Sequence, residues 1–382
     1  MLDRLTASTL LRSVIVGTAA VIIVMLAIDS WNSAQRLERS NRIVGVAGVS
    51  GNIFTAMHKL RTDRAATLRG LAAEAPLTPE AAANIKSLRD AETPALRAAI
   101  DALGALDFAE RAQLLPELQQ SVQKLAALQT ESWADMAKPK TARRDGLGKD
   151  YSETELALLA TLDTLSAQLF SSIKHDDPYI DQMMELKQLA WTVRDTSGNA
   201  SLAVSNALGA NALSPEDYRR YAGFVGGSET GWAAFEALAS GTDLPKQLTD
   251  AIATAKQVYF APDYTALRDR EMAALANGSP PEMPASKWTL FTVEHLDALV
   301  GVATASLAAA RDYSLEQHRA AQRDLVLQLV LLIGAVGLSG ATMMLVSRRA
   351  LTPLTTLRDA MLRVSRGRSH RRSPRSRGAA TK

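Results

Sequence analysis

Arginine and hydroxyl residues recur at matching positions in two segments of the chain, and together they could bind an anion. In residues 57–71, apolar positions three and four residues apart place Arg64 on the buried stripe of a helix. Arg194 lies at the edge of a similar stripe, and Thr67 and Ser197 each follow an arginine by three residues. A charge buried in such a stripe is costly unless it is paired or ligated. Two guanidinium groups from facing helices could bind a carboxylate, nitrate or similar small anion through bidentate hydrogen bonds.

The sequence also leaves open a structural explanation for these arginines. Either one could form an internal ion pair, or extend its charge to solvent along the side of the helix. The acidic residues available for such a pair are Asp63, Glu185 and Asp195. Arg61 belongs to the candidate ligand site as well, although its position favours a solvated face.

The sequence excludes several kinds of chemistry. There is no cysteine, so disulfides, zinc–thiolate sites, iron–sulfur clusters and thiol catalysis are absent. The five histidines form no pair at the spacing of a metal site, and no arrangement of Ser, His and Asp indicates nucleophilic catalysis. We therefore expect no enzyme activity, no cofactor and no metal site.

The residues around the arginines indicate helices. Good helix formers dominate, aromatic residues make up only 5%, and no apolar–polar alternation typical of strands is present. Hydroxyl residues followed by Pro or Glu predict helix starts at Thr78, Ser214 and Ser152. Helices of about 25 to 35 residues joined by short loops predict an all-α, up-and-down bundle.

A faint internal repeat predicts how these helices are grouped. "LRTDRAAT" at residues 60–67 aligns with "AWTVRDTS" at residues 190–197, and "LTPE" at 77–80 matches "LSPE" at 213–216. A repeat of this size predicts two four-helix modules, at about residues 33–173 and 178–323, which we expect to be stacked along the membrane normal.

Two uncharged apolar runs flank this region. Residues 325–346 are long enough to cross about 30 Å of hydrocarbon, and residues 13–28 reach that length when the run is extended to residue 31. A cleaved signal peptide is the alternative for the first run. The sequence therefore predicts transmembrane helices at residues 13–31 and 325–346.

Basic residues predict the orientation of these spans. Arg4 and Arg12 precede the first span, and residues 347–382 contain ten Arg, one Lys and one Asp. Positive charge marks the cytoplasmic side, so residues 1–12 are expected in the cytoplasm and residues 32–324 in the periplasm of a bacterial inner-membrane protein. The expected partners are the membrane, a small periplasmic ligand and a second copy in a homodimer, with no nucleic acid.

Residues 347–367 follow the second span as a basic amphipathic segment. Their heptad-spaced apolar residues, together with Pro353, Leu354 and Gly367, resemble the first helix of a HAMP linker, which joins a transmembrane helix to a cytoplasmic output. A generic basic helix on anionic lipid is the alternative. Residues 368–382 contain no Leu, Ile, Val, Met or aromatic residue, so we expect a disordered tail, a truncated HAMP linker and no output domain.

The arginine-centred segments carry a second resemblance. "HKLRTDRAATLRGL" at residues 58–71 and "LAWTVRDTSGNASL" at residues 189–202 resemble the arginine-centred helices of all-helical nitrate/nitrite-sensing input domains. Together with the HAMP-like segment, this resemblance implies the input portion of a methyl-accepting chemotaxis protein, which would relay ligand binding across the membrane. The alternatives are the sensor of a histidine kinase or diguanylate cyclase, and a ligand-free structural membrane protein that binds protein partners.

Overall fold

The computed structural model describes residues 7–106, 108 and 110–346, and these form α-helices, one short 3-10 helix and no strand. The all-α prediction is therefore confirmed for this part of the chain. The helices are α1 (Ala7–Ala72), α2 (Pro79–Ala105), α3 (Arg111–Met136), η2 (Lys140–Ala142), α4 (Leu147–Ile173), α5 (Pro178–Ala210), α6 (Pro215–Ala239), α7 (Lys246–Val258), α8 (Pro262–Ala276) and α9 (Ala285–Val346). The HAMP-like segment at 347–367 and the basic tail at 368–382 lie outside the described residues.

The chain divides into two compact units. One consists of Met1–Glu38 together with Arg319–Lys382, and the other, which we call the body, is Arg39–His318. Because α1 and α9 extend beyond the body at one end each, both helices contribute residues to both units.

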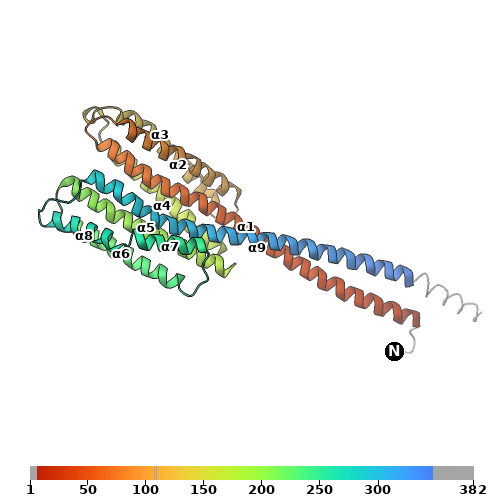
Figure 1. Ribbon diagram of the computed structural model, residues 1–382. Helices are drawn as coiled ribbons and strands as arrows, with labels where there is room; N and C mark the ends of the chain where they lie inside the picture. Colours follow the sequence, from red (N-terminus) through yellow and green to blue (C-terminus); the bar gives the residue numbers. More distant parts are fainter. Residues whose placement is uncertain (1–6, 107, 109, 347–382) are drawn as a thin grey trace, which may run out of the picture. The chain divides into compact units, whose positions relative to one another are not determined.

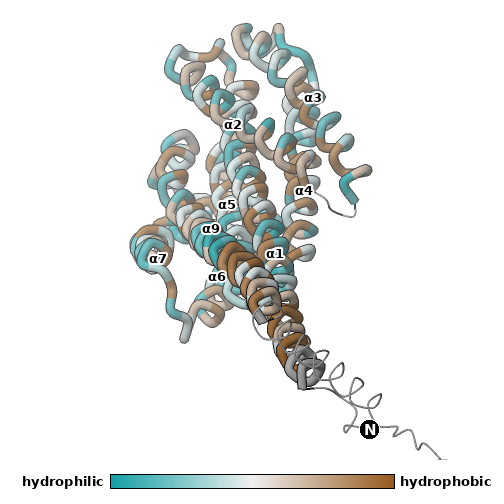
Figure 2. The backbone as a smooth tube through the Cα atoms, turned by 90° about the vertical axis from the view of Figure 1, so that its right-hand side faces the viewer, coloured by the Kyte–Doolittle hydropathy of each residue, from teal (hydrophilic) through white to brown (hydrophobic). Residues whose placement is uncertain are grey.

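Three described helices are long and apolar enough to cross a membrane by length and composition: Ser13–Ala72, Leu147–Ile173 and Lys287–Leu345. The most apolar window of Leu147–Ile173 is 39% buried, whereas those of the other two are 6% and 0% buried. Figure 2 shows the uncovered apolar stretches as hydrophobic segments of α1 and α9. Their large exposed side chains are Val14, Val16, Val21, Ile22, Val24, Met25, Ile28 and Trp31 in α1, and Val326, Leu327, Leu329, Val330, Leu331, Ile333, Val336, Leu338, Met344 and Leu345 in α9.

The first module of the body contains α1 to α4 (Figure 1). As predicted, α2 begins at a Thr78 N-cap, whose hydroxyl accepts a hydrogen bond from the Ala81 amide at 3.3 Å. The C-terminus of α1 is capped by the guanidinium of Arg143. It donates to the carbonyl oxygens of Gly70 (3.0 Å), Leu71 (2.7 Å), Ala73 (2.6 Å) and Ala75 (2.9 Å). Gly70 and Leu71 belong to the last turn of α1, whose carbonyls have no intrahelical donors, and Ala73 and Ala75 follow it, so Arg143 holds the end of α1 and the segment after it.

The second module contains α5 to α9, and aromatic side chains hold much of it together. Tyr264 of α8 stacks on His295 of α9 at 4.0 Å and on Trp288 at 6.2 Å. Trp288 is fully buried, and its indole nitrogen donates to the Ser201 carbonyl of α5 at 3.1 Å. The N-cap of α6 follows the expected pattern: the Ser214 side chain accepts a hydrogen bond from the Asp217 amide.

The two modules share one core. The rings of Phe54 (α1) and Trp191 (α5) meet edge to face at 5.1 Å, and Lys187 of α5 donates to Ser166 of α4 at 2.9 Å. Arg42 of α1 also pairs with Asp176, just before α5, and Arg61 of α1 pairs with Asp195 of α5. These contacts follow one another along α1 and α5, so the two modules pack side by side through these helices, and the predicted stacking of one module beyond the other is wrong.

The start of α4 differs from its predicted position, and one helix break was not predicted. α4 begins at Leu147 after Gly146, whose φ of 76° suits glycine, so Ser152 lies inside the helix and does not cap it. Leu147 and Tyr151 are already buried and start the apolar stripe earlier than the capping pattern suggests. A break between α7 and α8, after Val258, had no sequence prediction.

Candidate functional site

Arg194 of α5 is the most unusual side chain in the body. It is 7% exposed, and among the described residues it makes no hydrogen bond or ion pair, while its Nε is buried without an acceptor. Gly198, one turn further along α5, provides the space: a Cβ there would lie 3.2 Å from Arg194 Nη1. The fold therefore buries a guanidinium group without an internal acceptor.

Arg61 of α1 approaches the same region of α5. Its guanidinium forms an ion pair with Asp195, and their side chains are 15% and 34% exposed. The Arg61 guanidinium carbon lies 5.0 Å from the centroid of the Trp191 ring, and that of Arg194 lies 5.8 Å from it. Both cations thus lie against one buried indole, an arrangement that stabilises them in part through cation–π attraction.

The charges of this region act on one another. Burial first, and then the charge of Arg61, lower the pKa of Arg194 to about 10. Burial, followed by the charge of Arg194, lowers the pKa of His58 to about 4. Arg64 contributes to the same field, because its charge lowers the pKa values of both Arg61 and Arg194. We call Arg61, Arg64 and Arg194 the arginine cluster.

Two carboxylates partly offset the field at Arg194. The charges of Asp195 and Asp297 act to raise the pKa of Arg194, but the net shift is downward. Asp195 is already engaged by Arg61, and Asp297 forms no ion pair with Arg194. The arginine cluster therefore retains an excess of positive charge beside buried apolar surface.

The five predicted site residues are only partly brought together. Arg61, Arg64 and Arg194 form the arginine cluster. Thr67 lies in the core of the first module, where its hydroxyl bonds to Asp63 at 3.2 Å and to Arg89 at 3.0 Å. The Ser197 hydroxyl bonds to Ser228 of α6 at 2.7 Å.

The predicted position of Arg64 on the buried stripe is corrected by the structure. Asp63 is fully buried and follows Leu60 by three residues, whereas Arg64 is partly exposed. A three-residue step and a four-residue step are both compatible with one helix face, so spacing alone did not decide between the two neighbours. The expected solvated position of Arg61 is also wrong, because Asp195 and Trp191 cover its charge.

The sequence reasoning missed a set of buried carboxylates, Asp63, Glu92 and Glu155. A signal was present: Glu92 precedes Leu96, Ala99 and Leu103 on the buried stripe of α2. Histidine and cysteine spacings, on which the expectation of no metal site rests, do not detect such acids.

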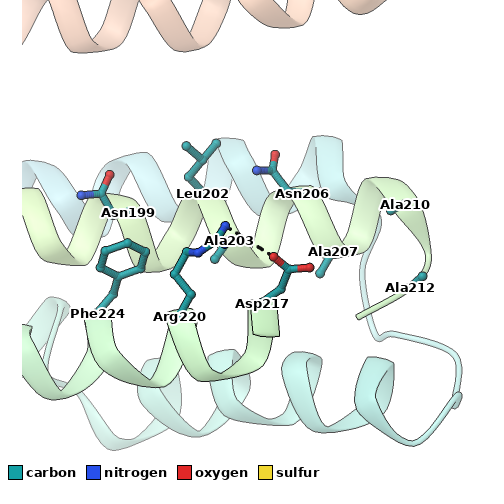
Figure 3. A pocket seen from close by; sticks show the side chains of 10 residues that line it. All are labelled: Asn199, Leu202, Ala203, Asn206, Ala207, Ala210, Ala212, Asp217, Arg220 and Phe224. Atoms are coloured by element: carbon teal, nitrogen blue, oxygen red, sulfur yellow. Dashed lines mark ion pairs between the residues drawn. The ribbon is translucent and has the colours of Figure 1, made fainter. Parts of the chain in front are cut away.

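A groove of about 370 Å³ lies between α5 and α6 and contains none of the predicted site residues (Figure 3). Asn199, Leu202 and Asn206 of α5 line one side. On the α6 side, Arg220 pairs with Asp217 at 3.5 Å. The charges of Arg220 and Asp217 neutralise each other, so these two residues offer the groove no unpaired charge comparable to that of Arg194.

No family model and no curated protein sequence matches the chain. Among solved structures, that of the NasR transcription antiterminator is similar, with a TM-score of 0.60 and 17% sequence identity over 87% of this chain and 86% of that chain. At this identity the comparison shows a shared helical fold.

This comparison corrects the interpretation of the chain as a chemoreceptor. The structure that shares its fold along most of its length is that of a transcription antiterminator, so the predicted chemotaxis signalling role and methyl-accepting chemotaxis identity are wrong. The HAMP assignment of residues 347–367 is likewise unsupported. Helical bundles serve unrelated functions, and an arginine-centred helix therefore does not specify a receptor class. The comparison also gives no support to the expected absence of a nucleic-acid partner.

Proposed function

We propose that the chain is a non-enzymatic regulatory protein whose body binds a small planar oxoanion, such as nitrate or a short carboxylate, at the arginine cluster. The observation that carries this proposal is the buried guanidinium of Arg194, which has no hydrogen-bond acceptor among the described residues. Because an unpaired buried charge is costly, a fold that retains one is expected to recruit a counter-charge from solution.

The chemistry of the cluster favours a planar monovalent anion. A guanidinium group offers N–H donors in a planar fork that matches two oxygens of a carboxylate or nitrate. Arg194 supplies this fork from α5, and Arg61 and Arg64 supply positive charge from α1. Trp191 provides a flat, buried surface beside both helices.

Binding in this position would join two elements of the body. α1 belongs to the first module and α5 to the second, so an anion between their arginines would strengthen the contact between the modules. A ligand that binds only the folded protein raises its stability in proportion to the logarithm of its concentration. A regulatory role is further supported by the similar fold of a transcription antiterminator.

The proposal also includes anchoring in a bacterial inner membrane as a homodimer, through residues 13–31 and 325–346, with residues 32–324 in the periplasm. The exposed apolar side chains of α1 and α9 support the two spans, because apolar surface of this extent requires cover in water. Recovery of the chain in membranes after alkaline extraction tests the anchoring, and release into the soluble fraction would contradict it.

Thermal unfolding of the full chain in detergent tests the ligand. We expect sodium nitrate or sodium formate to raise the Tm saturably above sodium chloride at equal ionic strength. The increase should disappear in Arg194→Met and persist in Arg97→Met, because Arg97 is exposed and lies on α2, outside the arginine cluster. Equal Tm values in all three salts for the wild type would contradict the proposal.

A further inference from the structure

Three carboxylates from three helices meet in the interior of the first module. They are Asp63 of α1, Glu92 of α2 and Glu155 of α4, and their exposed fractions are 0%, 1% and 0%. One oxygen from each lies within 4.8 Å of the others. We call these residues the carboxylate triad.

Asp63 is the member with the most partners. It accepts hydrogen bonds from the Tyr151 hydroxyl, from Thr67 at 3.2 Å and from Arg89 Nε at 3.1 Å. These donors hold its carboxylate in one orientation. Arg89 is also its ion-pair partner and is itself fixed by the Gln129 carbonyl at 2.9 Å.

The two glutamates, in contrast, present oxygens without donors. Gln129 donates to one oxygen of Glu92 at 2.8 Å, whereas the other oxygen of Glu92 and both oxygens of Glu155 are buried without a hydrogen-bond partner among the described residues. A buried carboxylate whose two oxygens both lack a donor is rare in folded proteins, and an unplaced water or ion is a recognised reason. Three buried acceptor oxygens of the two glutamates thus have no donor among the described residues.

The charges of the triad are also unbalanced. Arg89 is the cation in direct contact with the triad, and the charge of Arg64 acts on Glu155 without forming an ion pair with it. Three ionised carboxylates would therefore leave two negative charges without an ion-pair partner among the described residues. Burial, followed by the charge of Asp63, raises the pKa of Glu92 to about 8 and raises that of Glu155 strongly. Ionisation of the two glutamates is therefore disfavoured while no cation is present.

The types of ligand and their separations indicate which ion would fit. Carboxylate oxygens without nitrogen or sulfur ligands are typical of hard cations. Ca²⁺ binds oxygens at about 2.3–2.6 Å, so two of its ligands lie up to about 5 Å apart. The 4.8 Å limit within the triad agrees with that spread. Mg²⁺ requires a smaller and more regular octahedron and usually keeps several waters, for which a buried triad offers less room than an open site does.

We propose that Asp63, Glu92 and Glu155 bind a hard divalent cation of the size of Ca²⁺, which cross-links α1, α2 and α4. The charge of the ion matches the two negative charges that have no ion-pair partner. Its coordination would use donor-free oxygens of Glu92 and Glu155 together with one oxygen of Asp63. Tyr151 and Arg89 stay bonded to Asp63 and orient it. Metal binding requires deprotonated ligands, so the ion would favour the ionised forms of the two glutamates.

Calcium titration of the EDTA-treated full chain, followed by thermal unfolding, tests this site. We expect Ca²⁺ to raise the Tm of the wild type saturably, and to leave the Tm of Glu155→Gln and Glu92→Gln unchanged. Glu153→Gln is the matched control, because Glu153 lies on the same helix with its side chain 65% exposed. It should respond to Ca²⁺ as the wild type does.

Other outcomes would overturn the inference. One is an unchanged wild-type Tm at Ca²⁺ concentrations up to about 1 mM, the range in which weak extracellular sites bind. The others are a response in Glu155→Gln and Glu92→Gln equal to that of the wild type, and loss of the response in Glu153→Gln. Circular dichroism verifies folding before each titration. If one glutamine variant does not fold, the other decides, and if neither folds, the calcium responses of the wild type and of Glu153→Gln decide.

Discussion

Replacing Arg194 by methionine should stabilise the ligand-free protein, although the residue lies in the core. Methionine retains a long flexible side chain that fills most of the same space, and it removes the buried charge. Most core substitutions destabilise a protein, so an increase in stability would be diagnostic.

The magnitude follows from the environment of Arg194. Its pKa is lowered from 12.5 to about 10, mainly by burial. A pKa change of one unit corresponds to about 1.4 kcal/mol, so the buried charge costs about 3 kcal/mol. Loss of the contact with Trp191, whose centroid is 5.8 Å away, offsets about 1 kcal/mol of that gain. The unfolding free energy should therefore rise by about 2 kcal/mol at pH 7.

Arg61→Met provides the contrast. Its guanidinium is paired with Asp195, so removing it leaves a partly buried carboxylate without its partner. We expect a loss of about 2 kcal/mol, as for other hydrogen-bonded charges. Two arginines of one cluster should thus change stability in opposite directions.

The assay is thermal unfolding of the dialysed full chain in detergent, monitored by tryptophan fluorescence in a buffer of low anion content. For a body of this size, about 2 kcal/mol corresponds to a Tm change of roughly 4 °C. A fall of that size in Arg194→Met would refute the reasoning, because it would show that the guanidinium is satisfied within the protein.

Two further predictions concern buried bases. Burial and the charge of Arg194 lower the pKa of His58 from 6.5 to about 4, so between these pH values the unfolded chain binds a proton at His58 more readily than the folded chain does. The unfolding free energy should therefore rise with pH between about 4 and 6.5, by less than about 1.4 kcal/mol per pH unit. Above pH 6.5 the contribution of His58 should stay constant. Denaturant unfolding of wild type and His58→Gln checks this, and equal pH profiles would contradict it. Burial lowers the pKa of Lys187 to about 8, so Lys187→Met should raise the Tm at pH 7. Lys149→Met is the control and should leave the Tm unchanged, because Lys149 is exposed. A lower Tm in Lys187→Met would show that the hydrogen bond from Lys187 to Ser166 outweighs the cost of burying the charge.

Much of the helical fold was predictable because its signals are local. Proline directly after a hydroxyl residue sets the starts of α2 and α6 at Thr78 and Ser214, and this geometry involves a single turn of chain. The end of α1 was less predictable. Its cap is Arg143, about 70 residues further along the chain, so only the folded arrangement brings donor and acceptors together.

The candidate site was predictable in its residue types and less so in its geometry. The unusual positions of Arg64 and Arg194 in apolar stripes indicated a buried basic group, and the structure places Arg194 in that role. Helix periodicity does not show which neighbour faces inward where a helix is covered on two sides, and Asp63 took the position expected for Arg64. The pairing of Arg61 with Asp195 depends on the side-by-side packing of the modules, which the repeat alone did not reveal.

The central claim is that the arginine cluster binds a small oxoanion through Arg194. Isothermal titration of the full chain in detergent with sodium nitrate, at constant ionic strength, tests it most directly. The account predicts one saturable site in the wild type and in Arg97→Met, and no saturable heat in Arg194→Met. No saturable heat in the wild type, or an unchanged isotherm in Arg194→Met, would contradict it.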